Sequence, residues 1–377
     1  MCVGGDLIKK EQRIGIITHH YVHYYGAFLQ AYALQETLIS LYPSDEIEII
    51  NYVNLKHYLA SLRPLLIAKK PSSKNVVKSI NAFLERKKAI SQFYKAKRHL
   101  NLSPRMNNFK DINKRKYDTI VIGSDEVWNI NQIGLDKIKF AVGLDCPNII
   151  SYAASCGYFL PGQEIPSFVP QGIKNFNKIS VRDIQTKSMI GDFYNGKIEL
   201  VLDPTFLYDF KSEVKEIGNL VDIPYILVYQ CELDRDQINI LREFAKKEGM
   251  IIVGSSELRD WFDKSFINLS PFEWIELFNK SKYVITGAFH GTIFAIKANK
   301  KFISFPTYIN REQKIRSLLT TLGLEKQFVS KMDKYRICDY LVQDINYSVV
   351  DKTIEELKEK SIMFLKEAIC SKREVSN

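Results

Sequence analysis

Short apolar runs alternate with amphipathic segments along the first half of the chain. Residues 13–18 (RIGIIT) form an apolar run, apolar residues then recur at helical spacing from Phe28 to Leu41, and residues 46–52 alternate as a strand. Further strands are expected at residues 117–122, 148–153, 178–181 and 198–202. The first half is therefore predicted to consist of strands joined by helices.

The second half repeats this alternation after a break near residues 203–222. Strands are expected at residues 225–230, 250–253, 283–286 and 302–305. Helices are expected at residues 234–247, 271–280, 292–298, 311–322 and 352–368. Because strands that alternate with helices build parallel sheets, the pattern predicts an α/β protein of two Rossmann-like domains facing a cleft. We place the first domain at residues 1–205, the second at 206–345, and a C-terminal helix at 346–377, which we expect to pack back on the first domain.

Composition agrees with an ordinary globular protein. The chain has 377 residues, of which 46% are hydrophobic and 25% charged, and this excludes wholesale disorder and a membrane bundle. The N-terminus has no apolar core of a signal peptide, and the six cysteines are widely spaced without a CxxC pair. We therefore expect a cytoplasmic protein with reduced thiols.

The positive charge is concentrated in one segment. The formal net charge is +10, and residues 56–116 hold 17 of the 53 Lys and Arg but only Glu85 and Asp111 as acids. Apolar residues at near-helical spacing make this segment a basic amphipathic stretch. It could be a solvated helix packed on its own domain, or a contact with an anionic membrane surface, which would place the protein peripherally on the inner face. Contact with nucleic acid is not expected, because no recognition motif accompanies the charge.

Polar residues follow the predicted strands, where ligands bind in parallel α/β folds. The loop after the first strand carries His19, His20 and His23 before Gly26, which lets backbone approach a ligand. These histidines could line a substrate, pack in the core or bind zinc, although no metal-ligand spacing supports the last. We expect no metal and no cofactor.

Later strand ends add charged groups. Asp125 could act as a general base or cap a following helix, and Ser155 lies in a small-residue loop that suits backbone near a ligand or tight packing. Arg182 could grip a carboxylate or phosphate, or pair with a nearby acid. Residues 203–205 (DPT) form either a cleft-floor loop or, more simply, a proline turn.

His290 is the sharpest candidate for chemistry. It lies between a predicted strand ending at Thr286 and a helix expected to open at Gly291 and Thr292. A helix N-terminus favours an anion, and histidine is the usual general acid or base near neutral pH, although a structural capping role is the alternative. Lys314 and Arg316, near the start of a later helix, could add positive charge to the same cleft or lie on the surface.

Taken together, these segments resemble the polysaccharide pyruvyl transferase family. The likeness runs in order from about residue 14 to 330. The segments that carry it are residues 25–34 (YGAFLQAYAL), 123–129 (GSDEVWN), 180–182 (SVR), 203–205 (DPT), 289–292 (FHGT), 314–316 (KIR) and 322–324 (LGL). Ala288 stands where some members have an arginine, and Tyr24 where an asparagine is frequent.

The resemblance implies a glycosyltransferase-B-type arrangement and transfer of the enolpyruvyl unit of phosphoenolpyruvate to a sugar. The product would be a cyclic pyruvate ketal on a cell-surface or capsular polysaccharide intermediate, attached to a polyprenyl diphosphate. It implies that His290 is the catalytic histidine and Arg182 the donor-binding arginine; we add Asp125 as a weaker candidate for activating a hydroxyl. Substrate-binding residues are then expected to be His20, Tyr25, Gly26, Ser155, Phe289, Gly291, Thr292, Lys314 and Arg316.

Two other functions fit the same pattern. A sugar-nucleotide-dependent glycosyltransferase would use the same two-domain scaffold, since fold does not determine chemistry. The second alternative is a non-catalytic protein of a glycan-assembly complex. Its best support is Ala288, which stands where some family members have an arginine.

Overall fold

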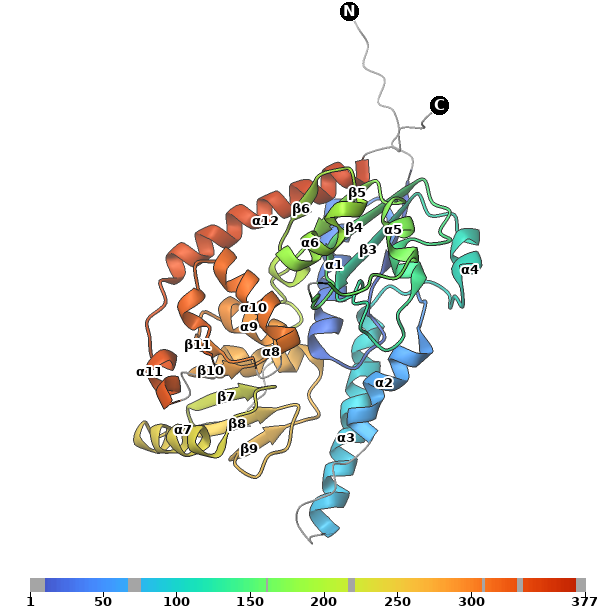
Figure 1. Cartoon of the computed structure of the whole chain (residues 1–377). Helices are drawn as coiled ribbons and strands as arrows, with labels where there is room; N and C mark the ends of the chain where they lie inside the picture. The colour runs from blue at the N-terminus through green and yellow to red at the C-terminus, as the bar shows by residue number, and fades with distance from the viewer. Residues whose placement is uncertain are drawn as a thin grey trace, which may run out of the picture.

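Two parallel sheets, one in each half of the chain, form the frame of the protein (Figure 1). The computed structural model describes residues 11–66, 76–160, 162–215, 221–306, 309–330 and 335–370. The first sheet has the order β2-β1-β3-β4-β5-β6 and the second β11-β10-β7-β8-β9. The strands of the first are β1 (Arg13–Ile17), β2 (Glu46–Ile49), β3 (Thr119–Asp125), β4 (Asn148–Ala154), β5 (Lys178–Val181) and β6 (Ile198–Leu200). Those of the second are β7 (Tyr225–Tyr229), β8 (Ile251–Ser255), β9 (Lys264–Phe266), β10 (Tyr283–Thr286) and β11 (Lys301–Ser304).

Helices connect the strands in both halves. The first half contains α1 (Tyr25–Leu41), α2 (Leu55–Leu66), α3 (Val76–Ala96), α4 (Phe109–Lys114), α5 (Phe168–Ile173) and α6 (Ile184–Ile190). The second contains α7 (Arg235–Lys247), α8 (Pro271–Lys280), α9 (Phe289–Lys297), α10 (Ile309–Thr321), α11 (Ile337–Leu341) and α12 (Tyr347–Cys370).

Most predicted elements lie where the hydrophobic pattern put them, and the differences are informative. The edge strand β9 was not predicted, because its three residues (KSF) contain no apolar run, whereas the equally short β6 lies in the apolar run at residues 198–202. The helix expected from residue 292 begins instead at Phe289, because Gly291 and Thr292 fit within its first turn. His290 is therefore the second residue of α9 rather than a loop residue before it.

The two halves share one hydrophobic core. Aromatic residues of α1 pack on α8: Tyr25 stacks on Trp274 with ring centroids 5.1 Å apart, and Phe28 meets Phe272 edge to face at 5.6 Å. These residues belong to a buried cluster that extends through both sheets. Burial of such large rings contributes about 2 kcal/mol or more each, which fixes α1 against the second half.

Helix α12 runs back from the second half to the first (Figure 1). The hydroxyl of Tyr347, at its start, donates to the carbonyl of Lys300, 2.5 Å away. Near its end, Nδ2 of Asn148 in β4 donates to the carbonyl of Ala368 at 2.9 Å, and the Ser361 hydroxyl accepts from the backbone N–H of Leu202 at 3.0 Å. The helix thus bridges the two halves on the side away from α2 and α3.

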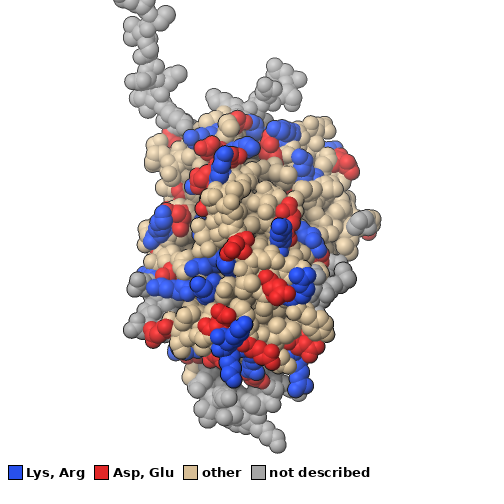
Figure 2. Space-filling model, turned by 90° about the vertical axis from the view of Figure 1, so that its left-hand side faces the viewer, with Lys and Arg blue, Asp and Glu red and all other residues tan. Residues whose placement is uncertain are grey.

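Helices α2 and α3 extend away from the first sheet as a pair (Figure 1). The Tyr58 and Tyr94 hydroxyls are 2.8 Å apart and join the two helices. Part of the basic segment, from Val76 to Phe83, lies in a stretch whose side chains are outside the described residues. On the face shown in Figure 2, Lys and Arg are interspersed with Asp and Glu, so the positive excess is not gathered there.

Candidate active site

A buried arginine binds two carboxylates at the carboxyl edge of the first sheet. Arg182, which follows β5, donates from one terminal nitrogen to Asp203 at 2.7 Å and from the other to Asp125 at 3.1 Å. Its side chain is only 1% exposed, and the guanidinium carbon lies 4.5 Å from the ring centroid of Phe289. Such a doubly paired guanidinium is charge-assisted and geometrically fixed.

His290 brings the second domain to this cluster. Its Nε2 lies 3.6 Å from Oδ2 of Asp203, the oxygen that Arg182 also contacts. The other side of the ring faces α1: a Cβ added at Gly26 would lie 2.1 Å from Nδ1 of His290. Only glycine at position 26 allows this approach, and the His290 side chain keeps 13% of its surface exposed.

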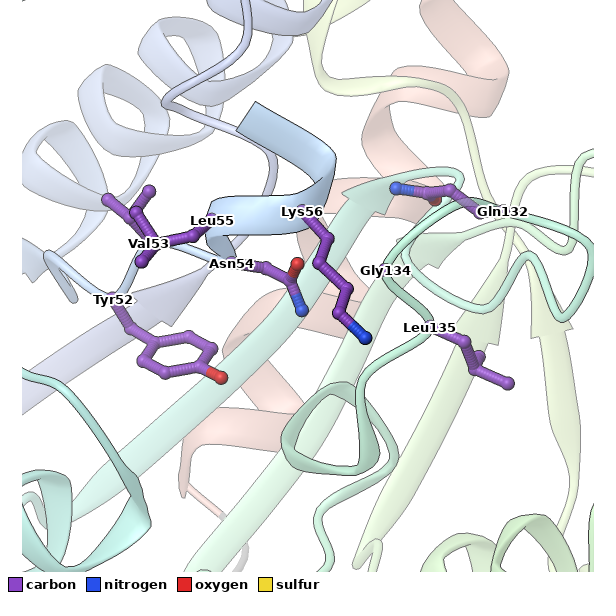
Figure 3. A pocket seen from close by; sticks show the side chains of 8 residues that line it. All are labelled: Tyr52, Val53, Asn54, Leu55, Lys56, Gln132, Gly134 and Leu135. Carbon is purple, nitrogen blue, oxygen red and sulfur yellow. The ribbon is translucent and has the colours of Figure 1, made fainter. Parts of the chain in front are cut away.

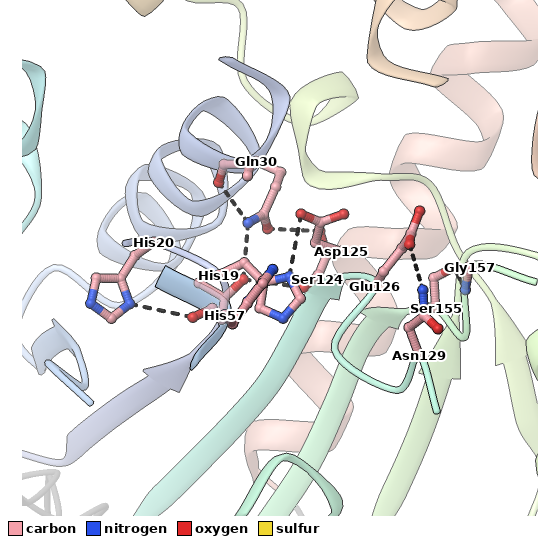
Figure 4. A network of polar contacts seen from close by, with 12 residues as sticks. His19, His20, Gln30, His57, Ser124, Asp125, Glu126, Asn129, Ser155 and Gly157 are labelled. Atoms are coloured by element: carbon pink, nitrogen blue, oxygen red, sulfur yellow. Dashed lines mark hydrogen bonds and ion pairs between the residues drawn. The ribbon is translucent and has the colours of Figure 1, made fainter. Parts of the chain in front are cut away.

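Behind Asp125 lies a second group of polar side chains in the first domain. Nδ1 of His19 is 3.8 Å from Oδ2 of Asp125, and its Nε2 is 2.6 Å from Nζ of the buried Lys139. The His57 ring lies edge-on to His19 with centroids 4.6 Å apart. Figure 4 shows His19, His57 and Asp125 side by side above the end of β3. This group holds Asp125 in one orientation.

Hydrogen bonds among loops and helix fix the backbone of the site. Gln30 of α1 donates to the Thr18 hydroxyl at 2.9 Å and accepts from the Ser124 hydroxyl at 2.8 Å. Asp125 has a φ of 75°, an unfavourable value for a residue with a side chain. Conformations of this kind persist where surrounding contacts enforce them, and they cluster at functional sites.

Both carboxylates of the cluster are held ionised. Burial by itself would raise the pKa of Asp203, but the neighbouring His290 and Arg182 hold it well below its usual range. Burial opposes ionisation of Asp125 too, yet His19 and Arg182 keep its pKa well below the ordinary value. Burial lowers the pKa of Lys139 to about 8. The site therefore offers two anionic proton acceptors and an amine that titrates near neutral pH.

A salt bridge closes the site on its other side. Lys314 of α10 pairs with Glu126, the residue after β3, and Nδ2 of Asn129 donates to the same carboxylate at 2.9 Å. The contact joins the two domains. The Lys314 charge is balanced by this pair, and its expected contact with substrate stays a prediction.

Several predicted substrate-binding residues are engaged in packing. Tyr25 is buried between Phe93 and Trp274, and its hydroxyl donates to the Leu269 carbonyl at 3.2 Å. The Ser155 side chain is fully buried and accepts from the backbone N–H of Gly157 at 3.0 Å. Their surroundings are those of structural residues, because large rings and small buried hydroxyls pack well there.

Four other residues expected to contact substrate make contacts within the protein: His20, Gly291, Thr292 and Arg316. His20 is buried, with Nδ1 3.3 Å from the Thr18 carbonyl, and burial lowers its pKa to about 3. Thr292 is buried and donates to the Ala288 carbonyl at 3.1 Å, and a Cβ at Gly291 would meet the Thr286 hydroxyl. Arg316 is half exposed and lies over Phe328 while pairing with Glu312 at 2.9 Å, so it does not join the cluster.

The structure decides the open alternatives for the strand-end loops. Asp125 does not cap a helix; it binds Arg182. Asp183 caps α6 instead of pairing with Arg182, accepting from the Thr186 N–H at 2.8 Å. Residues 203–205 form the turn that was favoured, but the Asp203 carboxylate also binds Arg182 and approaches His290, so the segment belongs to the site as well.

Lys139 was not identified from the sequence. It lies between apolar neighbours in a short turn, where a lysine gives no signal of burial. Within the described ranges, no group of three His, Cys, Asp or Glu side chains is placed to hold a metal ion. No helix among these residues is both long and apolar enough to cross a bilayer.

Comparison with known families decides what kind of protein carries this site. A family model described as polysaccharide pyruvyl transferase matches residues 25–307, which include Gly26, Asp125, Arg182, Asp203 and His290. The chain belongs to the polysaccharide pyruvyl transferase family. A search of curated proteins found no match.

Solved structures resemble this family member in fold. A UDP-N-acetylglucosamine 2-epimerase matches with a TM-score of 0.53 and 12% identity, covering 97% of this chain and 99% of that one. The S. aureus protein MnaA, solved with UDP, matches with a TM-score of 0.52 and 11% identity, covering 94% and 96%. At such identities the likeness concerns the fold alone. It agrees with two Rossmann-like domains in a glycosyltransferase-B-type arrangement, as the sequence predicted.

Proposed function

We propose that the protein transfers the enolpyruvyl unit of phosphoenolpyruvate to a sugar of a cell-surface polysaccharide intermediate. The acceptor is linked to a polyprenyl diphosphate at a membrane surface, and the product is a cyclic pyruvate ketal. One observation carries the proposal: His290 of the second domain lies 3.6 Å from the Asp203 carboxylate that Arg182 of the first domain binds. His290, a candidate proton donor of the second domain, and Asp203, a carboxylate of the first, therefore lie in one site.

Two helix N-termini meet at His290 and can hold the anionic donor. Neither Tyr24 at the start of α1 nor Ala288 at the start of α9 caps its helix with a side chain. Each helix end carries roughly half a positive charge and several backbone N–H donors. Gly26 brings the first turn of α1 against the His290 ring. The phosphate and carboxylate of phosphoenolpyruvate require positive potential of this kind.

Arg182 then serves the reaction by positioning. Both of its terminal nitrogens bind carboxylates, so its charge is already balanced by Asp125 and Asp203. We therefore assign it to orienting these two groups, rather than to binding the donor directly as the family resemblance implied. Replacement by lysine would lose the two-pronged geometry.

His290 is the proton donor in this scheme. The His290 ring lies beside the Asp203 carboxylate, and its imidazolium delivers a proton to the methylene carbon of phosphoenolpyruvate. The adjacent carbon becomes oxocarbenium-like. A sugar hydroxyl adds to it and loses its proton to a base, for which Asp125 is ionised and close.

The second half of the reaction closes the ring. The bond between the former enol carbon and the phosphate oxygen breaks, and inorganic phosphate leaves with the bonding electrons. A second hydroxyl of the same sugar adds to that carbon and releases its proton, giving the ketal. Phosphoenolpyruvate is itself the activated donor, so the scheme uses no cofactor.

Phosphate release from phosphoenolpyruvate, measured with a panel of glycosides, tests the proposal. We expect His290→Ala to lose about 10²–10⁴-fold in turnover while its thermal unfolding stays near that of the wild type. His99→Ala, which removes an exposed histidine, is the matched control. Near-normal turnover by folded His290→Ala would refute the assignment. Nucleotide release from a sugar nucleotide, without phosphate release, would instead identify a glycosyltransferase.

A further inference from the structure

A surface cavity of about 520 Å³ lies in the first domain, apart from the His290 cluster. Residues 52–56, which lead into α2, form one wall. Gln132, Gly134 and Leu135 form the other (Figure 3). Figure 3 shows the Lys56 side chain extending from α2 into the space between Asn54 and Leu135. None of the residues that line the cavity belongs to the His290 cluster.

The walls of this cavity are fixed by hydrogen bonds. The Tyr52 hydroxyl and Nδ2 of Asn54 both donate to one oxygen of Asp136, at 2.7 and 3.1 Å. Gly134 has a φ of 81°, and a Cβ there would lie 2.5 Å from Oδ1 of Asn54. The two walls thus touch in a way that only glycine permits, and the cavity is a built feature of the fold.

The chemistry of the lining favours an anion. Lys56 is the one charged residue among the eight that line the cavity. The N-terminus of α2, a twelve-residue helix, lies here and adds positive potential, and the Asn54 side chain caps it by accepting from the backbone N–H of His57 at 3.1 Å. Nε2 of Gln132 is buried and has no hydrogen-bond partner among the described residues. The nearby Asp136 carboxylate does not line the cavity, and one of its oxygens accepts from both Tyr52 and Asn54.

Exposed leucines flank this anion site. Leu55 and Leu59, one helical turn apart on α2, are 60% and 62% exposed, and Arg63 follows one turn later on the same face. A soluble surface rarely leaves two large apolar side chains so open beside basic ones. A face of this composition suits an interface between lipid chains and phosphate headgroups.

We propose that this cavity binds the phosphate headgroup of the lipid-linked acceptor, with Leu55 and Leu59 entering the lipid phase. The inference rests on the proposed function, since it names where the acceptor carrier is held. Lys56, Gln132 and the α2 N-terminus contact the phosphate.

The cavity is joined to the reacting groups by side chains. Asn54 in its wall accepts from the N–H of His57 at 3.1 Å. The His57 ring contacts His19, and His19 lies 3.8 Å from Asp125. The proposal requires that a sugar attached to the phosphate reaches the edge of the sheet that carries Asp125.

Vesicle flotation tests the site. The vesicles are phosphatidylcholine alone, phosphatidylcholine with a long-chain isoprenyl phosphate, and phosphatidylcholine with phosphatidylserine at equal surface charge. We expect binding to the isoprenyl phosphate vesicles at least about tenfold tighter than to either other kind. Lys56→Gln should weaken that binding about fivefold, and Leu55→Ser with Leu59→Ser at least tenfold. Lys246→Gln and Leu258→Ser, exposed positions of the second domain, should leave it unchanged.

Three results would overturn the inference. One is absence of binding at low salt. Another is equal binding to both kinds of charged vesicle, which would indicate general membrane charge. The third is full competition by inorganic pyrophosphate at concentrations similar to the lipid, which would indicate a soluble phosphate ligand. Turnover of a water-soluble glycoside by the unaltered protein tests the proposed function separately, so failure of one leaves the other to be judged on its own.

Discussion

Replacing Gly26 by alanine perturbs the contact between the two domains at the catalytic histidine. The new Cβ would lie 2.1 Å from Nδ1 and 2.3 Å from Cγ of His290, whereas ordinary contacts begin at 3.4 Å. The ring must therefore withdraw by about 1.3 Å, or the two helices must separate by a similar distance. Either movement takes the imidazole away from its position beside Asp203.

The size of the expected effect follows from this displacement. A misplacement of about 1 Å in a catalytic group costs on the order of 10²-fold in rate, or ~2.7 kcal/mol of barrier. Folding should suffer little, because alanine is favoured over glycine in a helix by up to about 1 kcal/mol. We expect kcat for phosphate release from phosphoenolpyruvate to fall about 100-fold with a nearly unchanged melting temperature.

Gly191→Ala provides the matched control. An added Cβ at Gly191 has no atom within 4 Å, so this variant should keep wild-type turnover. Steady-state kinetics and thermal unfolding on the three proteins give the comparison. Gly26→Ala with full activity would refute the placement of His290 against α1 as a requirement for catalysis.

Two further predictions concern charged groups of the site. Glu126→Gln leaves the Lys314 ammonium buried and unpaired, so we expect a loss of about 3 kcal/mol in unfolding free energy, partly recovered by adding Lys314→Met. Strictly additive costs in this urea-unfolding cycle would contradict the pair between the domains. For Lys139, whose pKa falls to about 8 in the fold from 10.5, the charged form is disfavoured by folding, so wild-type stability should rise as pH increases from about 8 to 10. The Lys139 contribution should reach up to about 3 kcal/mol. The rise should be smaller by this amount in Lys139→Met, where Lys97 and Lys297, whose pKa values burial also lowers to about 8, still contribute. Equal pH dependence in both proteins would count against the assignment.

The sequence by itself determined the architecture and the region of the site. Strand and helix periods are local properties, so the alternation along residues 13–305 predicted two parallel sheets and the edge where their loops gather. The same logic selected Asp125, Arg182 and His290, since polar residues at strand ends share one edge of a sheet. Among the strands, β9 was missed because Lys264–Phe266 contains no apolar run, and the short helices α5, α6 and α11 were not predicted either.

Tertiary structure decided how these residues act on one another. Asp125 lies 57 residues from Arg182 in sequence, and no local pattern shows that the two bind. At Asp203 the sequence does not distinguish a simple proline turn from a turn whose carboxylate is buried in an ion pair. Lys139 has the same apolar neighbours as many surface lysines, so its burial could not be predicted. Gly26 signalled a close approach, but not that His290 is what approaches it. Ion pairs and contacts between domains depend on distances across the folded chain, and periodicity along the chain carries no information about those distances.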